Sequence, residues 1–408
     1  MSSTRPRFGV DEWSIGADGI DIENLAHEES VFGLSNGHVG WRGNLDEGDP
    51  RGVAGSYLNG LFEEHPMPYA EEGYGYPECG QSVINAANGQ LIRLVVGDEP
   101  FDVRGGTLTS HIRRLDFRAG TLEREVEWTS PTGQRVLIRS TRIVSFAHRS
   151  VAAVHYRVQA LGAPAEVTVV SELLANEPLP ITHDDPRVQE LLSEPLEEVV
   201  SAADGGAATL VHRTRKSGLT TAVAMEHRVS GLPGSEPSVE TDIDAAGDRA
   251  RTTVRASLGE GETLEIVKFV GHEFSSDLSI AALRDRAETA VGDAVRAGWG
   301  TLVADQRARL DDFWECADVR VAGPPRLQQA VRFALFQVFQ ASVRMELRSV
   351  PGKGLTGSGY EGHTFWDFEA FVLPVLTSPL PHAAEPALRW RHSAHARARD
   401  RAAQLPLQ

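Results

Sequence analysis

The chain has 408 residues, of which 41% are hydrophobic and 24% charged, a composition typical of folded globular domains and unlike that of disordered or membrane-embedded chains. Its formal net charge is −17 at pH 7, so its surface repels phosphate backbones and we expect no nucleic-acid partner. No apolar run reaches the roughly 18 residues of a spanning helix, and no apolar segment follows the arginines near the start, so we expect neither a membrane anchor nor a secretion signal.

The first two-thirds of the chain predicts β-structure. Short apolar or alternating segments with turn signals between them are typical of antiparallel sheets. One hairpin is clear, because the turn sequence Ser-Pro-Thr-Gly at 130–133 separates two alternating segments. The predicted strands cover residues 91–96, 122–128, 135–143, 150–159, 165–171 and 262–270. These segments favour a large antiparallel β-sandwich, with a loop over 178–195.

The pattern changes to helix after the last predicted strand. Between residues 278 and 314 apolar side chains recur at helical spacing, and we expect Gly298 and Gly300 to divide this stretch into two helices. Residues 319–321 predict a short strand. The sequence Gly-Pro-Pro at 323–325 then favours a new helix start, because proline is tolerated in the first helical turn.

Three helical segments follow this restart. Residues 327–344 carry Phe, Leu, Val and Ala on several sides, which is typical of a helix buried by other elements. A second apolar helix is predicted from Phe368 onward, interrupted by Pro374, and a basic helix is predicted over 382–403. At about 11–12 residues per helix and its loops besides, the residues after Gly323 leave room for about three helices. Three helices are too few to enclose the apolar faces of the first one. We therefore expect the chain to be cut inside a helical domain.

The most informative stretch is 353–373, with the sequence KGLTGSGYEGHTFWDFEAFVL. Its glycines allow tight turns and a close approach of the backbone to a ligand. Trp366 beside Asp367 suits a sugar, because the C–H face of a pyranose packs on an indole while neighbouring hydroxyls donate to a carboxylate. The alternative is structural: a glycine-rich loop that caps a helix, with Trp366 as a core residue.

Nucleotide binding is less favoured in this stretch. The glycine spacings at 352–357 and 357–362 both match the dinucleotide pattern GxGxxG. Neither follows a convincing strand that opens a βαβ unit, and Pro374 interrupts the helix that should come next. The sequence therefore predicts no nucleotide cofactor.

Histidine and cysteine patterns predict neither a metal site nor a disulfide framework. His382, His392 and His395 lie among arginines, and no carboxylate-rich partner set accompanies them. Cys79 and Cys316 are far apart in sequence and belong to no CxxC or Cys/His cluster, which suits a reducing compartment. We expect a cytoplasmic protein without metal or cofactor.

Three separated segments resemble glycoside hydrolase family 65, the maltose, trehalose and kojibiose phosphorylase family. They are ESVFGLSNGHVGWRGN at 29–44, GSYLNG at 55–60, and the elements GLTG, GY, GH and FWD within 354–367. Their order is that of the family, and the resemblance covers essentially the whole chain as the N-terminal portion of the enzyme. It implies a multidomain fold, β then α. The implied parts are a large antiparallel β-sandwich over 1–272, a helical linker over 273–323, and the first helices of a truncated (α/α)6 catalytic barrel over 324–408.

The resemblance also implies a function. Family members mostly phosphorolyse α-linked glucose disaccharides with inversion, giving β-glucose 1-phosphate, and inorganic phosphate is then the co-substrate. Carried to this sequence, Trp366 and Asp367 match the family's pair that holds the non-reducing glucose, and His363 and Phe365 shape the same substrate-binding pocket. In the family the general acid is a glutamate, expected here beyond residue 408. We therefore assign no catalytic residue and expect this fragment to be inactive alone.

Three functions stay open at this point. The leading one is inverting phosphorolysis of a trehalose-, maltose- or kojibiose-type disaccharide, the second is trehalase-like inverting hydrolysis, and the third is a non-catalytic carbohydrate-binding fragment. A local acid among Glu361, Asp367 and Glu369 is less favoured. Asp367 has a binding role by resemblance, and the other two suit loop or helix-cap positions.

The expected partner is an α-glucoside disaccharide, without nucleic acid or membrane, and the full-length form is a candidate homodimer. Tyr69, Tyr74 and Tyr76 lie in a loop that is able to reach substrate or the barrel mouth. Packing within the sandwich is the favoured role for these three tyrosines.

Overall fold

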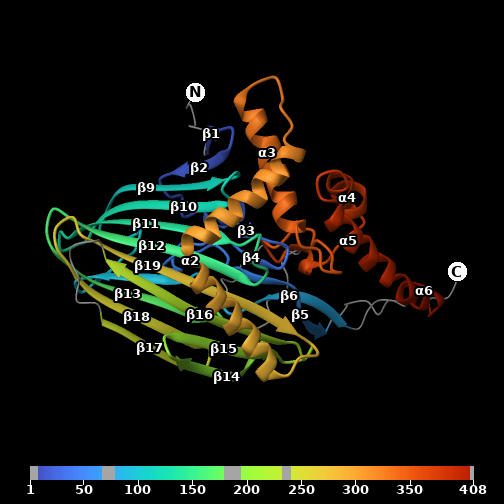
Figure 1. Cartoon of the computed structure of the whole chain (residues 1–408), viewed down its shortest axis with the longest axis horizontal. Helices are drawn as coiled ribbons and strands as arrows, with labels where there is room; N and C mark the ends of the chain where they lie inside the picture. Colours follow the sequence, from blue (N-terminus) through green and yellow to red (C-terminus); the bar gives the residue numbers. More distant parts are fainter. Residues whose placement is uncertain (1–7, 67–78, 179–193, 232–239, 405–408) are drawn as a thin grey trace.

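The computed structural model describes residues 8–66, 79–178, 194–231 and 240–404. A layered β-domain comes first and the helices follow it, so the predicted β-then-α fold class is confirmed (Figure 1). The predictions for Tyr69, Tyr74 and Tyr76, and for nearly all of the loop 178–195, fall outside the described residues.

The largest sheet has ten antiparallel strands in the order β1-β2-β9-β10-β11-β12-β19-β16-β15-β14. At its centre is the predicted hairpin, in which β10 and β11 pair from Leu122 opposite Arg142 to Thr129 opposite Arg135. Side chains along β10 alternate between buried and half-buried because successive residues point to opposite faces of a sheet. The strands are β1 (Gly9–Asp11), β2 (Ser14–Asp18), β9 (Thr107–Asp116), β10 (Thr121–Thr129), β11 (Arg135–Val144), β12 (Val151–Leu161), β14 (Leu196–Asp204), β15 (Ala207–Thr214), β16 (Thr220–Gly231) and β19 (Thr263–Ser275).

Two smaller sheets form the second layer of the sandwich. Their orders are β17-β18-β13-β7-β8 and β3-β4-β5-β6. The main hydrophobic core lies between the layers, where for example Trp128 of β10 meets Phe101 edge-on with ring centroids 5.3 Å apart. The strands are β3 (Leu34–Ser35), β4 (Val39–Trp41), β5 (Ser56–Pro66), β6 (Cys79–Asn85), β7 (Ile92–Val96), β8 (Glu99–Pro100), β13 (Ala165–Leu174), β17 (Glu240–Ala246) and β18 (Arg249–Leu258).

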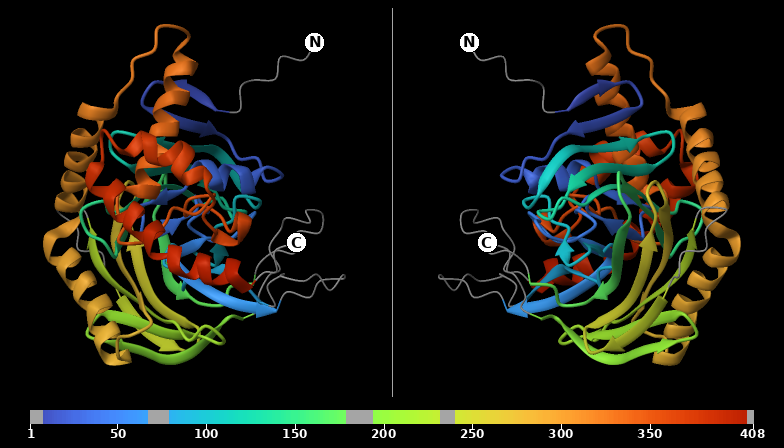
Figure 2. Two further views of the ribbon diagram at one scale, coloured as in Figure 1. Left: turned by 90° about the vertical axis from the view of Figure 1, so that its right-hand side faces the viewer. Right: turned by 90° about the vertical axis from the view of Figure 1, so that its left-hand side faces the viewer.

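Helix α2 (Ile280–Ala317) runs along the outer face of the ten-stranded sheet, as Figure 2 shows in orange. Its Leu283 and Val291 belong to a second apolar cluster, which includes Phe269 of β19. The predicted division of this stretch is confirmed as a kink. Gly298 has φ 78° and ψ 160° inside the helix, a conformation that glycine adopts at little steric cost.

Residues 319–321 do not form the predicted strand. The amide of Gln328 takes the place of a neighbouring strand: its Oε1 accepts from the Val321 N–H at 2.9 Å, and its Nε2 donates to the Val319 carbonyl at 2.9 Å. A side chain thus satisfies the backbone groups that a ladder would have satisfied.

Helix α3 (Pro325–Ser342) begins with proline in its first turn, as predicted. It buries Phe336 and Phe339, but its buried face is not mainly apolar. Gln329, Arg332 and Gln340 are buried there too, and all three make hydrogen bonds to other elements. The prediction that other elements bury this helix is confirmed for one face only, and amide and guanidinium groups carry much of the contact of that face with the sandwich.

The remaining helices are short and lie beside the part of the sandwich that holds β3 to β6 (Figures 1 and 2). The helix predicted from Phe368 is a π-helical turn, η2 (Phe368–Val372), followed by α4 (Leu373–Leu376). The predicted basic helix is two helices, α5 (Pro381–Ser393) and α6 (His395–Gln404). The others are α1 (Leu25–Val31) and the 3-10 turn η1 (Gly359–Gly362).

The last strand ends at Ser275 and α2 begins at Ile280, while the exact domain limits at 272/273 and 323/324 stay predictions. Across the described ranges, no helix combines the length and the apolar character needed to cross a bilayer.

Two buried histidines lie close to the junction between the sheets. The indole Nε1 of Trp41 on β4 donates to Nε2 of His272 on β19 at 3.3 Å, and the His38 ring stacks on Phe274 at 6.0 Å. Burial, together with repulsion from the neighbouring Lys268, lowers the pKa of His272 to about 3. Burial likewise holds the pKa of His38 well below its ordinary value. Both rings are therefore neutral at pH 7.

This burial predicts a defined loss of stability in acid. Below about pH 6.5 the unfolded chain binds a proton at His272 while the folded chain does not, until the pH approaches the folded pKa near 3. Over that window each such histidine is expected to lower the free energy of unfolding by about 1.4 kcal/mol per pH unit. Calorimetric melting temperatures should therefore fall less steeply with acidification in His272→Asn than in the wild type.

His395→Asn is the matched control, because this imidazole is exposed on α6. It should keep the wild-type slope of melting temperature against pH. An unchanged slope in His272→Asn would show that the His272 ring titrates normally in the folded protein.

Candidate functional site

The glycine-rich loop, residues 351–364, joins α3 to the turn η2. It closes on itself, because the Gly352 N–H donates to the His363 carbonyl at 3.0 Å. Tyr360 and Glu361 both have φ 56°, a left-handed conformation that costs roughly 1–2 kcal/mol for a residue with a side chain. The surroundings must hold such a turn in place, and strain of this kind is concentrated at functional sites.

The N-terminal segment 29–44 forms the surface on which the glycine-rich loop rests. Gly40 on β4 leaves no room for a side chain, since a Cβ there would lie 2.3 Å from the Cβ and the carbonyl oxygen of Leu355. Beside it, the Arg42 guanidinium donates to the carbonyl of Thr356, 314 residues further along the chain. The first and third segments of the family resemblance are thus in direct contact.

Arg42 is held in this position by Glu29. The two charged groups lie 3.5 Å apart, and both side chains are buried. The Glu29 carboxylate also accepts from the N–H groups of Gly52 and Val53 at 2.9 and 2.8 Å. A buried ion pair is costly unless its remaining hydrogen bonds are satisfied, and here they are. Neither residue has a predicted role from the sequence alone, although a charged pair in a glycine-rich apolar segment is a signal of one.

A second anchor joins the middle segment of the resemblance to the same place. The Asn59 side chain on β5 donates to the carbonyls of Gly37 and Ser349, both at 3.0 Å. Ser35 on β3 donates twice to Gln340 near the end of α3, from its N–H to the side-chain Oε1 and from its hydroxyl to the backbone carbonyl, both at 3.0 Å. All three segments therefore meet at one junction between the sandwich and the helices.

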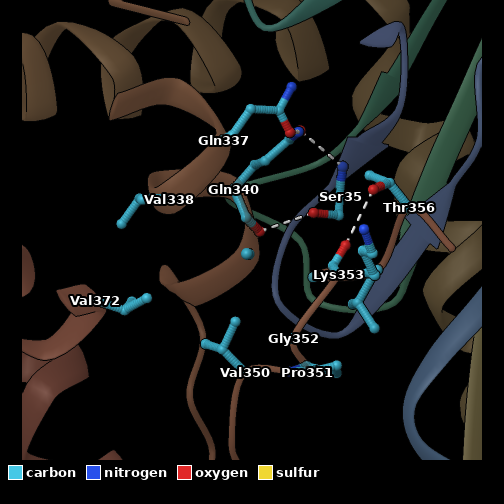
Figure 3. Close-up of a pocket in the computed structure, with 13 residues that line it drawn as sticks. Ser35, Gln337, Val338, Gln340, Val350, Pro351, Gly352, Lys353, Thr356 and Val372 are labelled. Atoms are coloured by element: carbon cyan, nitrogen blue, oxygen red, sulfur yellow. Dashed lines mark hydrogen bonds between the residues drawn. The ribbon is translucent and has the colours of Figure 1, made fainter. Parts of the chain in front are cut away.

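A small pocket opens beside this junction, with a volume of about 290 Å3 (Figure 3). Ser35 and Gln340 lie on one side of it, joined by their hydrogen bonds, and Val372 of η2 lies on another. Lys353 brings a charge to the wall, and its ammonium group is 5.7 Å from the centre of the Tyr360 ring. None of the four predicted sugar-binding residues lines this pocket.

Trp366 and Asp367 lie next to each other at the start of η2 and face solvent. The Trp366 side chain is 72% exposed, so the alternative in which it fills the core is wrong. Its ring lies 6.5 Å from that of Phe371, which is also exposed. The Asp367 carboxylate is exposed and makes no hydrogen bond or ion pair with any described residue. An indole and an unpaired carboxylate are therefore both accessible to a ligand.

His363 and Phe365 are directed differently. His363 lines a second, larger cavity, where its Nε2 donates to the Gln81 carbonyl of β6 at 2.6 Å. Phe365 meets Tyr360 edge-on at 5.3 Å. The four predicted residues are thus close in the chain, but the described residues do not gather them around one pocket.

The other carboxylates of this segment lie close to basic side chains. Glu369 accepts from the Arg391 guanidinium of α5 at 2.5 and 2.9 Å, and Glu361 lies 3.9 Å from the His65 imidazole. Asp367 therefore differs from both in having no partner among the residues that the structure describes. In the described part of the chain, no group of three or more His, Cys, Asp or Glu side chains is placed to hold a metal ion.

Comparison with known proteins decides the family. The model "Glycosyl hydrolase family 65, N-terminal domain" matches residues 15–313, and "Glycosyl hydrolase family 65 central catalytic domain" matches residues 332–408. The chain belongs to glycoside hydrolase family 65. The second match includes the glycine-rich loop with Trp366 and Asp367.

Individual relatives agree with this assignment. An uncharacterised glycosyl hydrolase of Mycobacterium tuberculosis is 53% identical over 99% of this chain and 51% of its own length. The α,α-trehalose phosphorylase of Thermoanaerobacter brockii is 30% identical over 98% of this chain and 52% of its own. A solved structure provisionally named a kojibiose phosphorylase, from the human microbiome, has the same fold, with TM-score 0.87 and 22% identity over 98% of this chain and 51% of that one. The chain spans about half the length of these relatives.

The contact between Gly40 and Leu355 predicts that a single methyl group added at residue 40 destabilises the protein. Gly40→Ala should lower the melting temperature and speed amide hydrogen exchange in residues 351–364, because the new Cβ overlaps backbone that cannot move alone. Overpacking of this kind costs about 1–3 kcal/mol.

Gly292→Ala in α2 is the matched control. There the added Cβ meets only the guanidinium tip of Arg296 at 3.4 Å, so the substitution should leave stability unchanged or raise it by up to about 1 kcal/mol through helix propensity. Equal melting temperatures and equal exchange in the two variants would argue against the close contact.

Proposed function

We propose that the protein takes part in inverting phosphorolysis of an α-linked glucose disaccharide of the trehalose, maltose or kojibiose type, releasing β-glucose 1-phosphate. The observation that carries the proposal is the exposed Trp366 indole beside the unpaired Asp367 carboxylate. Relatives named as trehalose, maltose and kojibiose phosphorylases support phosphorolysis as the reaction.

The chemistry of the pair suits the non-reducing glucose. The C–H face of the sugar packs on the indole, and ring hydroxyls donate to the carboxylate in hydrogen bonds worth about 1.5–3 kcal/mol each. Asp367 gives up no protein partner when it accepts them. His363, fixed by Gln81, and Phe365, packed on Tyr360, then orient the segment that carries the pair.

The mechanism divides between this chain and the part of the enzyme that follows it in the relatives. Inversion needs an acid that protonates the leaving oxygen and a nucleophile on the opposite face of the sugar. With phosphate as the nucleophile, no carboxylate base is needed. Glu369 is paired with Arg391, and Glu361 lies in the turn η1 beside the His65 imidazole, so we assign the acid to neither. We assign to the chain the binding of glucose through Trp366 and Asp367.

Inverting hydrolysis is the second candidate, because the relatives at 52–53% identity are named glycosyl hydrolases. The two reactions differ in whether phosphate or an activated water attacks the sugar. We further propose a cytoplasmic location, which the two free, exposed cysteines and the acidic composition support. The homodimer of the full-length form stays a prediction.

The full-length gene product should convert at least one of trehalose, maltose, kojibiose and nigerose, and only when phosphate is supplied. The measurement is chromatography of the products with and without phosphate. Glucose 1-phosphate that requires added phosphate is the expected result. Free glucose formed at the same rate without phosphate would replace this proposal with hydrolysis.

Substitutions in the same full-length product test the pair itself. Asp367→Asn should lower kcat/KM by about a hundredfold, since it removes a charged acceptor of sugar hydroxyls, and Trp366→Ala should lower it by at least about tenfold. Asp242→Asn, at an exposed aspartate on the edge strand β17, is the matched control and should keep full activity. Wild-type kcat/KM in both site variants would exclude the pair from the substrate site.

A further inference from the structure

The larger cavity lies between the sandwich and the glycine-rich loop, and it holds a volume of about 800 Å3. Its lining comes from β5, β6, the end of β19, the residues that lead into α2, the loop, and α5. Phe62, Phe274 and Trp390 give it aromatic walls, and Asn59 and Gln81 add amide groups. The combination of aromatic and polar walls is typical of a small-molecule site.

Positive charge gathers at this cavity although the chain as a whole carries −17. Arg149, Arg286 and Arg348 line it, against the carboxylates of Glu273 and Asp277. Arg344 and Glu346 do not line the cavity, and their charged groups lie 4.0 Å apart. When these two are included, four guanidinium groups face three carboxylates.

Arg149 pairs with two of the three carboxylates, those of Glu346 and Glu273. Its Nε donates to both oxygens of Glu346 at 2.7 and 2.8 Å, and its Nη1 donates to Glu273 at 2.8 Å. Asp277 is exposed at the outer end, just before α2. Arg286 and Arg348 are therefore left without a carboxylate partner among the described residues.

Arg348 is the more buried of these two unpaired arginines. Its guanidinium lies over the Phe274 ring at 4.4 Å, and one of its nitrogens, Nη1, donates to the Asn59 carbonyl. Burial, followed by repulsion from Arg149, lowers the pKa of Arg348 although Glu346 and Glu273 act in the opposite direction, so the charge of Arg348 is only partly compensated. An anion in the cavity would supply the missing compensation and accept from its other N–H groups.

We propose that this cavity binds a phosphate group, with Arg348 and Arg286 as the guanidinium donors. The planar fork of arginine matches the oxygens of a phosphate, and the space and the aromatic walls allow the phosphate to be free or to carry a sugar. The site is separate from Trp366 and Asp367, which do not line the cavity, and it does not require phosphorolysis. His363 lines it, so a bound ligand would contact the segment that holds the glucose-binding pair.

Calorimetric titration of the 408-residue chain tests the proposal with inorganic phosphate, glucose 6-phosphate and glucose as probes. The titration contains no disaccharide substrate and measures no turnover, so its outcome is independent of the proposed function. We expect one equivalent of phosphate or glucose 6-phosphate to bind, and glucose not to bind at this site. A lower Kd for glucose 6-phosphate would show that the aromatic walls hold the sugar, and equal values would assign the site to the ion alone.

Arg286→Gln should raise the Kd about tenfold, the loss expected for one charge-assisted contact. This arginine is exposed on α2, so its replacement leaves the fold intact. Arg296→Gln removes the same charge from an exposed position of the same helix and should leave the Kd unchanged. The proposal is overturned if neither phosphate compound binds, or if the two variants bind phosphate equally well.

Discussion

The close packing of Gly40 against Leu355, with Arg42 bonded to the neighbouring Thr356 carbonyl, is the constraint on which the site depends. Only a residue without a side chain allows two backbones to approach so closely. The guanidinium then fixes the direction of the loop, because it is buried and paired with Glu29 and has no alternative partner in solvent. The sandwich is thus part of the support for the sugar-binding segment rather than a separate module.

This support explains how an exposed pair is kept in a defined position. The loop that leads to Trp366 contains left-handed residues and few hydrogen bonds of its own. Asn59 holds Ser349, which lies just before the loop, and Gln81 holds the end of the loop through His363. Both anchors come from the β5–β6 hairpin of the sandwich. Among the described residues the Asp367 carboxylate makes no hydrogen bond or ion pair, and the Trp366 indole stays exposed beside Phe371, while the backbone that leads to them is tied down.

Local signals in the sequence predicted much of the fold. The hairpin around 130–133 was placed within one residue at the ends of both strands, because side-chain alternation and turn chemistry are local properties. The kink at Gly298 follows equally from one residue. The strand expected at 319–321 is absent because the Gln328 amide satisfies its backbone groups, and no periodicity reveals such a substitution.

The sequence predicts the sugar-binding side chains of the site, but it does not predict the contacts that hold them in position. A tryptophan beside an aspartate in a glycine-rich stretch, together with the family resemblance, pointed to the sugar-binding pair. The partners of Arg42 and Asn59 lie 314 and 290 residues away in the chain, so no local pattern identifies them. A crystal structure of the full-length gene product with bound glucose tests the central claim most directly. We expect the sugar ring to stack on the Trp366 indole with hydroxyls bonded to Asp367. Glucose bound elsewhere, with this pair still in solvent, would contradict the account.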